Sequence, residues 1–148
     1  MKAVDICRKP AVTVTAGTSL IEVARLMRSR HIGSVVVTDN DGGRKPVGIV
    51  TDRDIVIEVT AMGLDANVMT AGDIMTQSPA VSEPGDDALW ALKIMRDRGV
   101  RRLPVVDANG EVEGLLAFDD LVQHLGNTLG DVAQVIGTER TVEGVRRA

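Results

Sequence analysis

The hydrophobic and polar positions of the chain follow two patterns. From residue 19 to residue 30 the apolar side chains recur at intervals of three and four, which predicts an amphipathic helix with Thr18 or Ser19 as its N-cap and Glu22 in its first turn. Short β-branched runs such as Val35-Val36-Val37 predict strands instead. The chain is therefore expected to adopt an α+β fold in which short strands alternate with helices.

The same order of elements occurs twice, about 68 residues apart. Asp5-Ile6-Cys7 returns as Asp73-Ile74-Met75, and Pro10-Ala11-Val12-Thr13 returns as Pro79-Ala80-Val81-Ser82. The predicted elements of the first copy are residues 12–15, 19–30, 34–39, 47–51 and 52–62, and those of the second are 80–82, 86–98, 103–107, 114–117 and 118–125. Each copy thus has the order β-α-β-β-α, and residues 40–45 and 108–111 are rich in Gly, Asn and Asp, which favour hairpin turns.

The two copies are expected to pack against each other with pseudo-twofold symmetry, because one unit of about 55 residues is only marginally stable alone. We divide the chain into a first repeat at residues 1–66, a second repeat at 67–126 and a C-terminal extension at 127–148. The extension has Leu129, Val132, Val135 and Ile136 at helical spacing, which predicts an amphipathic helix. Two interpretations of this helix stay open: it covers a flank of the module, or it contacts a second copy of the chain.

Composition and charge narrow the classes of partner. The chain has 148 residues, 17 Lys and Arg against 21 Asp and Glu, and only Trp90 and Phe118 as aromatic residues, so neither a basic surface nor base-stacking side chains point to nucleic acid. Cys7 is the single cysteine and is expected to be a packing residue, and His31 and His124 complete no metal-ligand spacing, so no metal site is predicted. No apolar run approaches the roughly 18 residues of a membrane span, and we expect a soluble, cytoplasmic protein with no membrane partner.

Catalytic motifs are absent from the sequence. It contains no G-x-S-x-G, no G-x-x-x-x-G-K-[ST] and no H-E-x-x-H. The acidic pairs Asp52/Asp54 and Asp119/Asp120 stand at predicted helix starts, where the helix dipole already favours them. We therefore expect a protein that is not an enzyme.

The repeated pattern resembles a known family. Asp-Ile-(Cys/Met), Pro-Ala-Val, an amphipathic helix, Val-Val-x-Asp and Gly-hydrophobic-hydrophobic-Thr-x-x-Asp together resemble the cystathionine-β-synthase (CBS) domain, and two copies over residues 2–125 resemble the stand-alone CBS pair called a Bateman module. The resemblance implies a regulatory module that binds an adenosine-containing ligand such as AMP, ADP, ATP or S-adenosylmethionine in a cleft between the copies. It also implies a homodimer that signals to another protein, which the sequence does not identify.

The candidate ligand site centres on Thr51 and Asp54. A strand ends at Thr51 and a helix begins, so free backbone N–H groups lie beside its hydroxyl and favour phosphate, while Asp54 in the first turn has a carboxylate that can accept hydrogen bonds from ribose. The same spacing also fits a helix cap that needs no ligand. By resemblance, Ile49 flanks the base, Ala80 and Val81 supply apolar wall, Arg101 and Arg102 supply charge for phosphate, and Ile32, Gly33 and Ser34 complete the cleft.

The second copy departs from the pattern. It keeps the acid at Asp120 and an apolar residue at Leu115, but Ala117 stands where the hydroxyl belongs, and Phe118 could crowd the cleft. A lost hydrogen bond to a charged group costs about 1.5–3 kcal/mol, so we expect a strong first site and a weak or empty second site. The alternative function is a ligand-free structural or dimerisation module.

Overall fold

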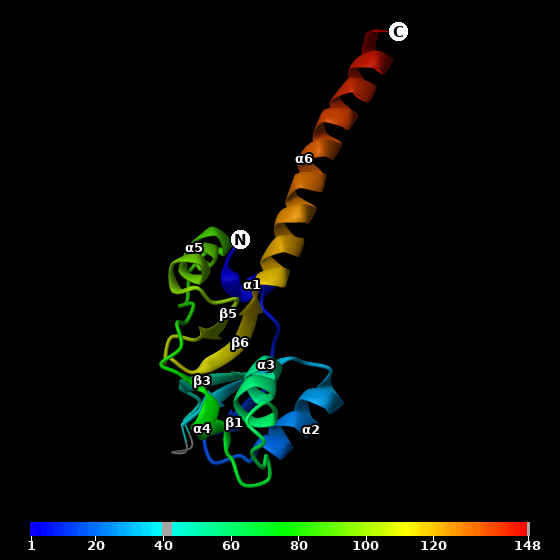
Figure 1. The fold of residues 1–148 in the computed structure, drawn as a ribbon. Coiled ribbons are helices and arrows are strands. Elements are labelled where there is room, and N and C mark those ends of the chain that lie inside the picture. Colours follow the sequence, from blue (N-terminus) through cyan, green and yellow to red (C-terminus); the bar gives the residue numbers. More distant parts are fainter. Residues whose placement is uncertain (40–42, 148) are drawn as a thin grey trace.

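The computed structural model describes residues 1–39 and 43–147 and shows two α+β units with one long helix projecting away from them (Figure 1). The first unit contains β1 (Thr13–Thr15), α2 (Leu20–Arg30), β2 (Ser34–Thr38), β3 (Pro46–Thr51), α3 (Asp52–Ile55) and the π-helical turn η1 (Val56–Thr60). The second contains α5 (Ala88–Arg98), β5 (Arg102–Val106), β6 (Val112–Ala117) and α6 (Phe118–Arg147). The α+β fold with two repeats and a C-terminal helix is as predicted.

The helix ends are set by local side chains. Ser19 caps α2: its hydroxyl accepts a hydrogen bond from the Glu22 amide, and its own amide donates to the Glu22 carboxylate. Asp87 caps α5 through the Trp90 amide at 2.7 Å. The two helices end in left-handed residues at equivalent positions, His31 with φ 53° and Gly99 with φ 64°.

In both repeats, the segment that precedes one repeat in the sequence packs against the other repeat. In the larger sheet the order is β1-β2-β3-β4, where β1 runs parallel to β2 and the other pairs are antiparallel. Its last strand, β4 (Thr76–Gln77), follows α4 (Ala71–Ile74) and belongs by sequence to the second repeat. In the same way Arg8 pairs with Leu115 of β6, and the Ala3 amide in α1 (Ala3–Ile6) donates to the Asp86 carbonyl at 2.8 Å.

Three clusters of buried side chains hold the molecule together. The first-repeat core takes Ala71 from α4, and the second-repeat core takes Ala3 from α1. A smaller cluster lies where the two repeats meet and consists of Ala11, Val36 and Val112. Packing therefore crosses the sequence boundary between the repeats. Each leading segment, α1 before the first repeat and α4 before the second, places a small apolar residue in the core of the other repeat.

Some predicted elements differ from the structure. The predicted strand at 80–82 is reduced to one parallel bridge, Ser82 to Val105, because Pro79 and Pro84 on either side lack the N–H groups that a longer ladder needs. The predicted turn at 108–111 is present, with Asp107 accepting from the Asn109 and Glu111 amides at 2.8 and 3.0 Å. These bonds hold the pKa of Asp107 below its usual range. For the turn at 40–45, residues 40–42 lie outside the described part of the chain.

The C-terminal region differs most. The predicted helix at 118–125 and the helix of the extension are one continuous helix, α6, of 30 residues. Four glycines, Gly126, Gly130, Gly137 and Gly144, lie within it without ending it, since no proline interrupts the hydrogen-bonding pattern. The prediction that the extension covers a flank of the module is wrong, because every residue from 126 to 147 is exposed.

Candidate functional site

Two crevices lie between the repeats, related by the pseudo-twofold symmetry. The first has a volume of about 310 Å³ and is lined by Ile49, Thr51, Thr76, Ser78, Pro79, Ala80, Arg98, Val100, Arg101 and Arg102. The second has a volume of about 250 Å³ and is lined by Arg8, Pro10, Ala11, Val12, His31, Ile32, Gly33, Ser34, Arg102, Leu115, Ala117 and Asp119. Nine of the ten residues of the first crevice have their repeat equivalents in the second, for example Ile49 with Leu115 and Val100 with Ile32, and Arg98 is the exception.

Thr51 stands at the junction of β3 and α3. Its amide donates to Asp54 Oδ2 at 2.7 Å, and the Asp54 amide donates to Thr51 Oγ1 at 3.2 Å. The helix cap expected from the spacing is therefore formed and uses one carboxylate oxygen of Asp54. Thr51 lines the first crevice, whereas Asp54 lies directly behind it and is not one of the lining residues.

Three arginines of the second repeat face Thr51 across the first crevice. Arg98 ends α5, Arg102 begins β5, and Arg101 lies between them. The Arg101 guanidinium forms an exposed ion pair with Asp119 at 3.2 Å and lies over the Phe118 ring at 5.4 Å. Exposed pairs of this kind contribute at most about 1 kcal/mol, so Arg101 can exchange Asp119 for a bound anion at little cost. This crevice therefore combines a hydroxyl with three positive charges.

The walls of the first crevice are apolar. Ile49 is 9% exposed, and Ala80 and Val100 are half-buried beside it. Val81, which was predicted to share this wall, lines instead, with Trp90, a neighbouring depression that shares Ala80 with the first crevice. An apolar wall opposite polar and charged groups is the arrangement that a flat, partly polar ligand requires.

The structure separates residues that were predicted to act together. Ile32, Gly33 and Ser34 line the second crevice with Leu115, not the first crevice with Thr51. Among the predicted residues, Arg102 alone lines both crevices in the described part of the chain. The pseudo-twofold axis is the reason, because residues at equivalent positions of the two repeats must lie in opposite crevices.

Sequence reasoning missed five residues of the first crevice: Arg98, Val100, Thr76, Ser78 and Pro79. A signal for the first two existed in the repeat itself. Residues 98–102 of the second repeat are equivalent to residues 30–34 of the first. If residues of the 30–34 segment line the crevice that contains Ala117, the pseudo-twofold symmetry requires their equivalents in 98–102 to line the crevice that contains Thr51. Thr76 and Ser78 carried no such signal, because only the pairing of β4 with β3 brings them to this edge.

The second crevice has a different balance of charge. The Ala117 amide donates to Asp120 Oδ2 at 3.0 Å, which repeats the bond made by Thr51, but no side-chain hydroxyl is present at this position. Arg8 is paired with Asp120 at 3.4 Å, and Asp119 adds a negative charge to the lining. His31, the exposed C-cap of α2, also lines this crevice.

Cys7 packs behind the second crevice, against Gly114 of β6. Burial raises the pKa of its thiol, so Cys7 is a neutral packing residue at neutral pH. Within residues 1–39 and 43–147, no group of three or more His, Cys, Asp or Glu side chains is placed to hold a metal ion. Among the helices that the structure describes, none has the length and apolar character needed to cross a bilayer.

Comparison with known proteins gives relatives along most of the chain. A protein of Methanopyrus kandleri is 36% identical over 119 residues, which is 80% of this chain and 60% of that protein. Hypoxic Response Protein I, solved with two coordinated zinc ions, is 31% identical in sequence, and its structure superposes with a TM-score of 0.73. The match covers 84% of this chain and 98% of that chain. A CBS domain protein from Pyrobaculum aerophilum complexed with AMP is 27% identical, with a TM-score of 0.75, over 86% of this chain and 99% of that one.

The model of one family matches both repeats. The CBS domain model matches residues 3–60 and 71–127, which include both α1 and α4, both crevice edges and the first turns of α6. The resemblance seen in the repeated sequence pattern is thereby confirmed. With two matched domains in tandem and structural neighbours of the same two-domain architecture, this chain belongs to the CBS domain family and is a Bateman module.

Proposed function

We propose that this protein is a regulatory module that binds an adenosine nucleotide, with AMP as the first candidate, in the first crevice and changes its contacts with another protein when the crevice is filled. The observation that carries the proposal is the meeting of Thr51 from one repeat with Arg98, Arg101 and Arg102 from the other. Phosphate binding needs donors and positive charge together, and this crevice supplies both.

The size and lining of the crevice support a nucleoside monophosphate. Its volume of about 310 Å³ lies at the lower end of the range for small-molecule sites. In the proposed complex, Ile49, Ala80 and Val100 contact the base, and the arginines contact the phosphate. Asp54 exchanges its cap bond for a ribose hydroxyl or accepts a second bond through its other oxygen. The AMP complex of the Pyrobaculum relative supports the same ligand class.

We assign the second crevice a weaker role. It has no hydroxyl at Ala117, Gly33 takes the place of Arg101, and Asp119 faces any incoming phosphate. The loss of one hydrogen bond and of one positive charge, together with the added negative charge of Asp119, favours a single nucleotide per chain at low ligand concentration. We further propose that the chain acts as a homodimer and is regulatory rather than catalytic.

The first test compares Asp54→Ala with Asp120→Ala. Both substitutions remove the same cap bond at equivalent helix starts, but only Asp54 is bonded to Thr51, which lines the first crevice. We expect Asp54→Ala to weaken AMP binding at least tenfold in isothermal titration calorimetry, because a hydrogen bond with a charged group is lost. Asp120→Ala should leave the first-site affinity within twofold of the native value.

The proposal fails if AMP, ADP, ATP and S-adenosylmethionine all give no binding heat with the native chain. It also fails if Asp54→Ala and Asp120→Ala weaken binding equally, since that result would indicate a general effect on folding. The absence of binding heat would favour the alternative of a ligand-free structural module. A companion measurement with Arg101→Ala should show a larger loss of affinity for AMP than for adenosine, because only AMP has the phosphate.

A further inference from the structure

Arg102 lies where the two crevices meet. It is the first residue of β5 and is paired with Ala117 in the ladder between β5 and β6. Its side chain lines both crevices, so it lies near Thr51 on one side and near Ala117 on the other. The equivalent residue of the first repeat is Ser34, which is paired with Thr51 in the same way but lines the second crevice and not the first. One cation is therefore shared by two crevices that are otherwise related by the pseudo-twofold symmetry.

The charge of Arg102 has no carboxylate beside it. In the described part of the chain its guanidinium forms no ion pair, whereas the neighbouring Arg101 is paired with Asp119 at 3.2 Å. Arg102 is also half-buried, so water screens its charge less than that of an exposed side chain. A cation in this position attracts an anion, and a phosphate in either crevice can supply it.

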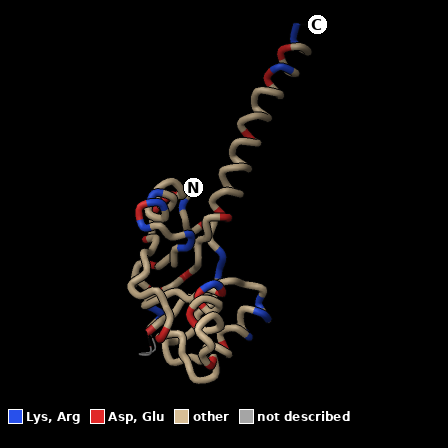
Figure 2. Tube along the Cα trace, viewed as in Figure 1, with Lys and Arg blue, Asp and Glu red and all other residues tan. Residues whose placement is uncertain are grey.

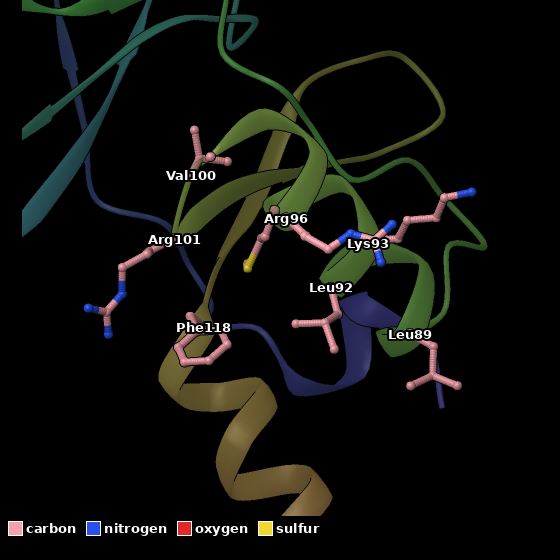
Figure 3. Close-up of a pocket in the computed structure, with 9 residues that line it drawn as sticks. Leu89, Leu92, Lys93, Arg96, Val100, Arg101 and Phe118 are labelled. Carbon is pink, nitrogen blue, oxygen red and sulfur yellow. The ribbon is translucent and has the colours of Figure 1, made fainter.

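A second charged link joins the two crevices. Arg101 lines the first crevice, Asp119 lines the second, and their ion pair crosses from one to the other. Figure 3 shows Arg101 beside Phe118 at the start of α6, and the Arg101 carbonyl accepts a hydrogen bond from the Phe118 amide at 2.8 Å. The backbone of Arg101 is thus held in place, while its side chain is 71% exposed and can rotate from Asp119 toward a phosphate.

The first repeat has the backbone contact without the charged link. The residues equivalent to Arg101 and Asp119 are Gly33 and Arg53. The Gly33 carbonyl accepts a hydrogen bond from the Asp52 amide at 3.0 Å, which repeats the contact at the start of α6. Figure 2 shows few charged residues along the middle of α6, so the charges that connect the crevices lie in the two repeats. The ion pair therefore distinguishes the second repeat from the first.

We propose that the two crevices compete for Arg102, so that a phosphorylated ligand in one crevice lowers the affinity of the other crevice for a second phosphate. One guanidinium forms its bidentate pair with one phosphate at a time. Two phosphates held near the same cation also repel each other. The effect is mutual, because coupling between two binding sites is reciprocal. This inference rests on the proposed function and adds to it that the two sites are coupled.

Asp119 strengthens the competition. A phosphate in the first crevice draws Arg101 away from Asp119, and the carboxylate then faces the second crevice without a counter-charge. Its negative charge repels a second phosphate there, because charges this close lie within the screening length of about 8 Å at physiological salt. While the first crevice is empty, Arg101 neutralises Asp119 and the second crevice accepts phosphate more readily. The chain therefore holds one nucleotide over a wide range of concentration.

The experiment follows each crevice separately by methyl NMR of the full chain during titration with AMP. The methyl groups of Ile49 report on the first crevice and those of Leu115 on the second. The variant Asp54→Ala/Arg98→Glu weakens the first crevice, since it removes the proposed ribose partner and reverses one charge. With the first crevice empty, Leu115 should respond at an AMP concentration at least tenfold lower than in the native chain, because Arg102 is then available to the second crevice.

A matched pair of variants tests the part played by Asp119. Asp119→Asn should lower the AMP concentration at which Leu115 of the native chain responds by about twofold to fivefold, because an amide does not repel phosphate. Asp97→Asn is the control. Asp97 is an exposed partner of Arg96 at 3.0 Å, and neither residue lines a crevice, so the same change of net charge should leave the response of Leu115 within twofold of native.

The outcomes separate the coupling from the proposed function. If Ile49 responds to AMP but Leu115 responds at the same concentration in the native chain and in Asp54→Ala/Arg98→Glu, the crevices are independent and the coupling is wrong. Absence of any Leu115 response in both chains would also overturn it. If AMP moves neither methyl signal of the native chain, the proposed function fails, and the coupling fails with it.

Discussion

Thr51 and Ala117 show how one hydroxyl group separates two otherwise equivalent positions. Both follow a strand, both begin a helix, and both donate a backbone hydrogen bond to an aspartate three residues on, at 2.7 and 3.0 Å. Only Thr51 also accepts a bond, from the Asp54 amide. The same hydroxyl serves the helix cap in the free protein and is available to a ligand in the first crevice.

Stability measurements should separate the capping role of this hydroxyl from its binding role. Without nucleotide, Thr51→Ala should lower the free energy of unfolding by about 1 kcal/mol, and Ala117→Thr should raise it by up to about 1 kcal/mol, because an N-cap side chain has that effect. Urea denaturation followed by circular dichroism measures both. If Ala117→Thr is destabilising, the start of α6 does not have the cap geometry described here.

At the scale of elements, the exchange of leading segments is the main feature of the fold. Helix α1 packs on the second repeat and α4 packs on the first, although each precedes the other repeat in sequence. Two glycines allow the close approach. A Cβ on Gly48 would collide with the flexible side chain of Met75, and a Cβ on Gly114 would lie 2.9 Å from the backbone carbonyl oxygen of Arg8.

These two glycines give a matched test of the exchange. Gly114→Ala should lower the free energy of unfolding by about 1–3 kcal/mol, because a backbone strand must move to make room. Gly48→Ala should also be destabilising, since the added methyl would lie 2.9 Å from the Cβ of Met75, which cannot move without its backbone. Chemical denaturation of both variants measures these losses, and an unchanged stability of Gly114→Ala would show that Arg8 does not lie against β6 in solution.

At the scale of the whole molecule, the exchanged segments make the two repeats one folding unit. Neither core is complete without a piece of the other half, and Ala11, Val36 and Val112 join them at the centre. A ligand in the first crevice contacts both repeats and therefore stabilises this unit as a whole. Helix α6 beyond its first turns stands outside this unit and is exposed along its length.

Calorimetry should therefore show a single unfolding transition for the two repeats. AMP at 100 times its dissociation constant should add about 2.7 kcal/mol to the free energy of unfolding and move that single transition to a higher temperature. Differential scanning calorimetry with and without AMP measures this. Two separate transitions, only one of which responds to AMP, would contradict the coupling of the repeats.

Much of the fold and part of the site followed from local pattern. The helix at 20–30, its Ser19 cap, the paired central strands and the repeat itself were predictable, because periodicity and capping depend on residues close together in the chain. The asymmetry between Thr51 and Ala117 was visible for the same reason. The continuity of α6 through four glycines was not predictable, since its exposed turns follow from the lack of a proline rather than from a positive signal.

The sequence by itself determined that two related α+β units exist, that one has a hydroxyl and the other lacks it, and that an apolar stripe follows them. Only the tertiary structure decided that Ile32, Gly33 and Ser34 face Leu115 while Arg98, Arg101 and Arg102 face Thr51. It also decided that α1 packs on the second repeat, that α4 packs on the first, and that α6 projects away from both. The reason is that the mutual orientation of the repeats depends on contacts between residues far apart in the chain, such as Val36 and Val112, which no local pattern encodes.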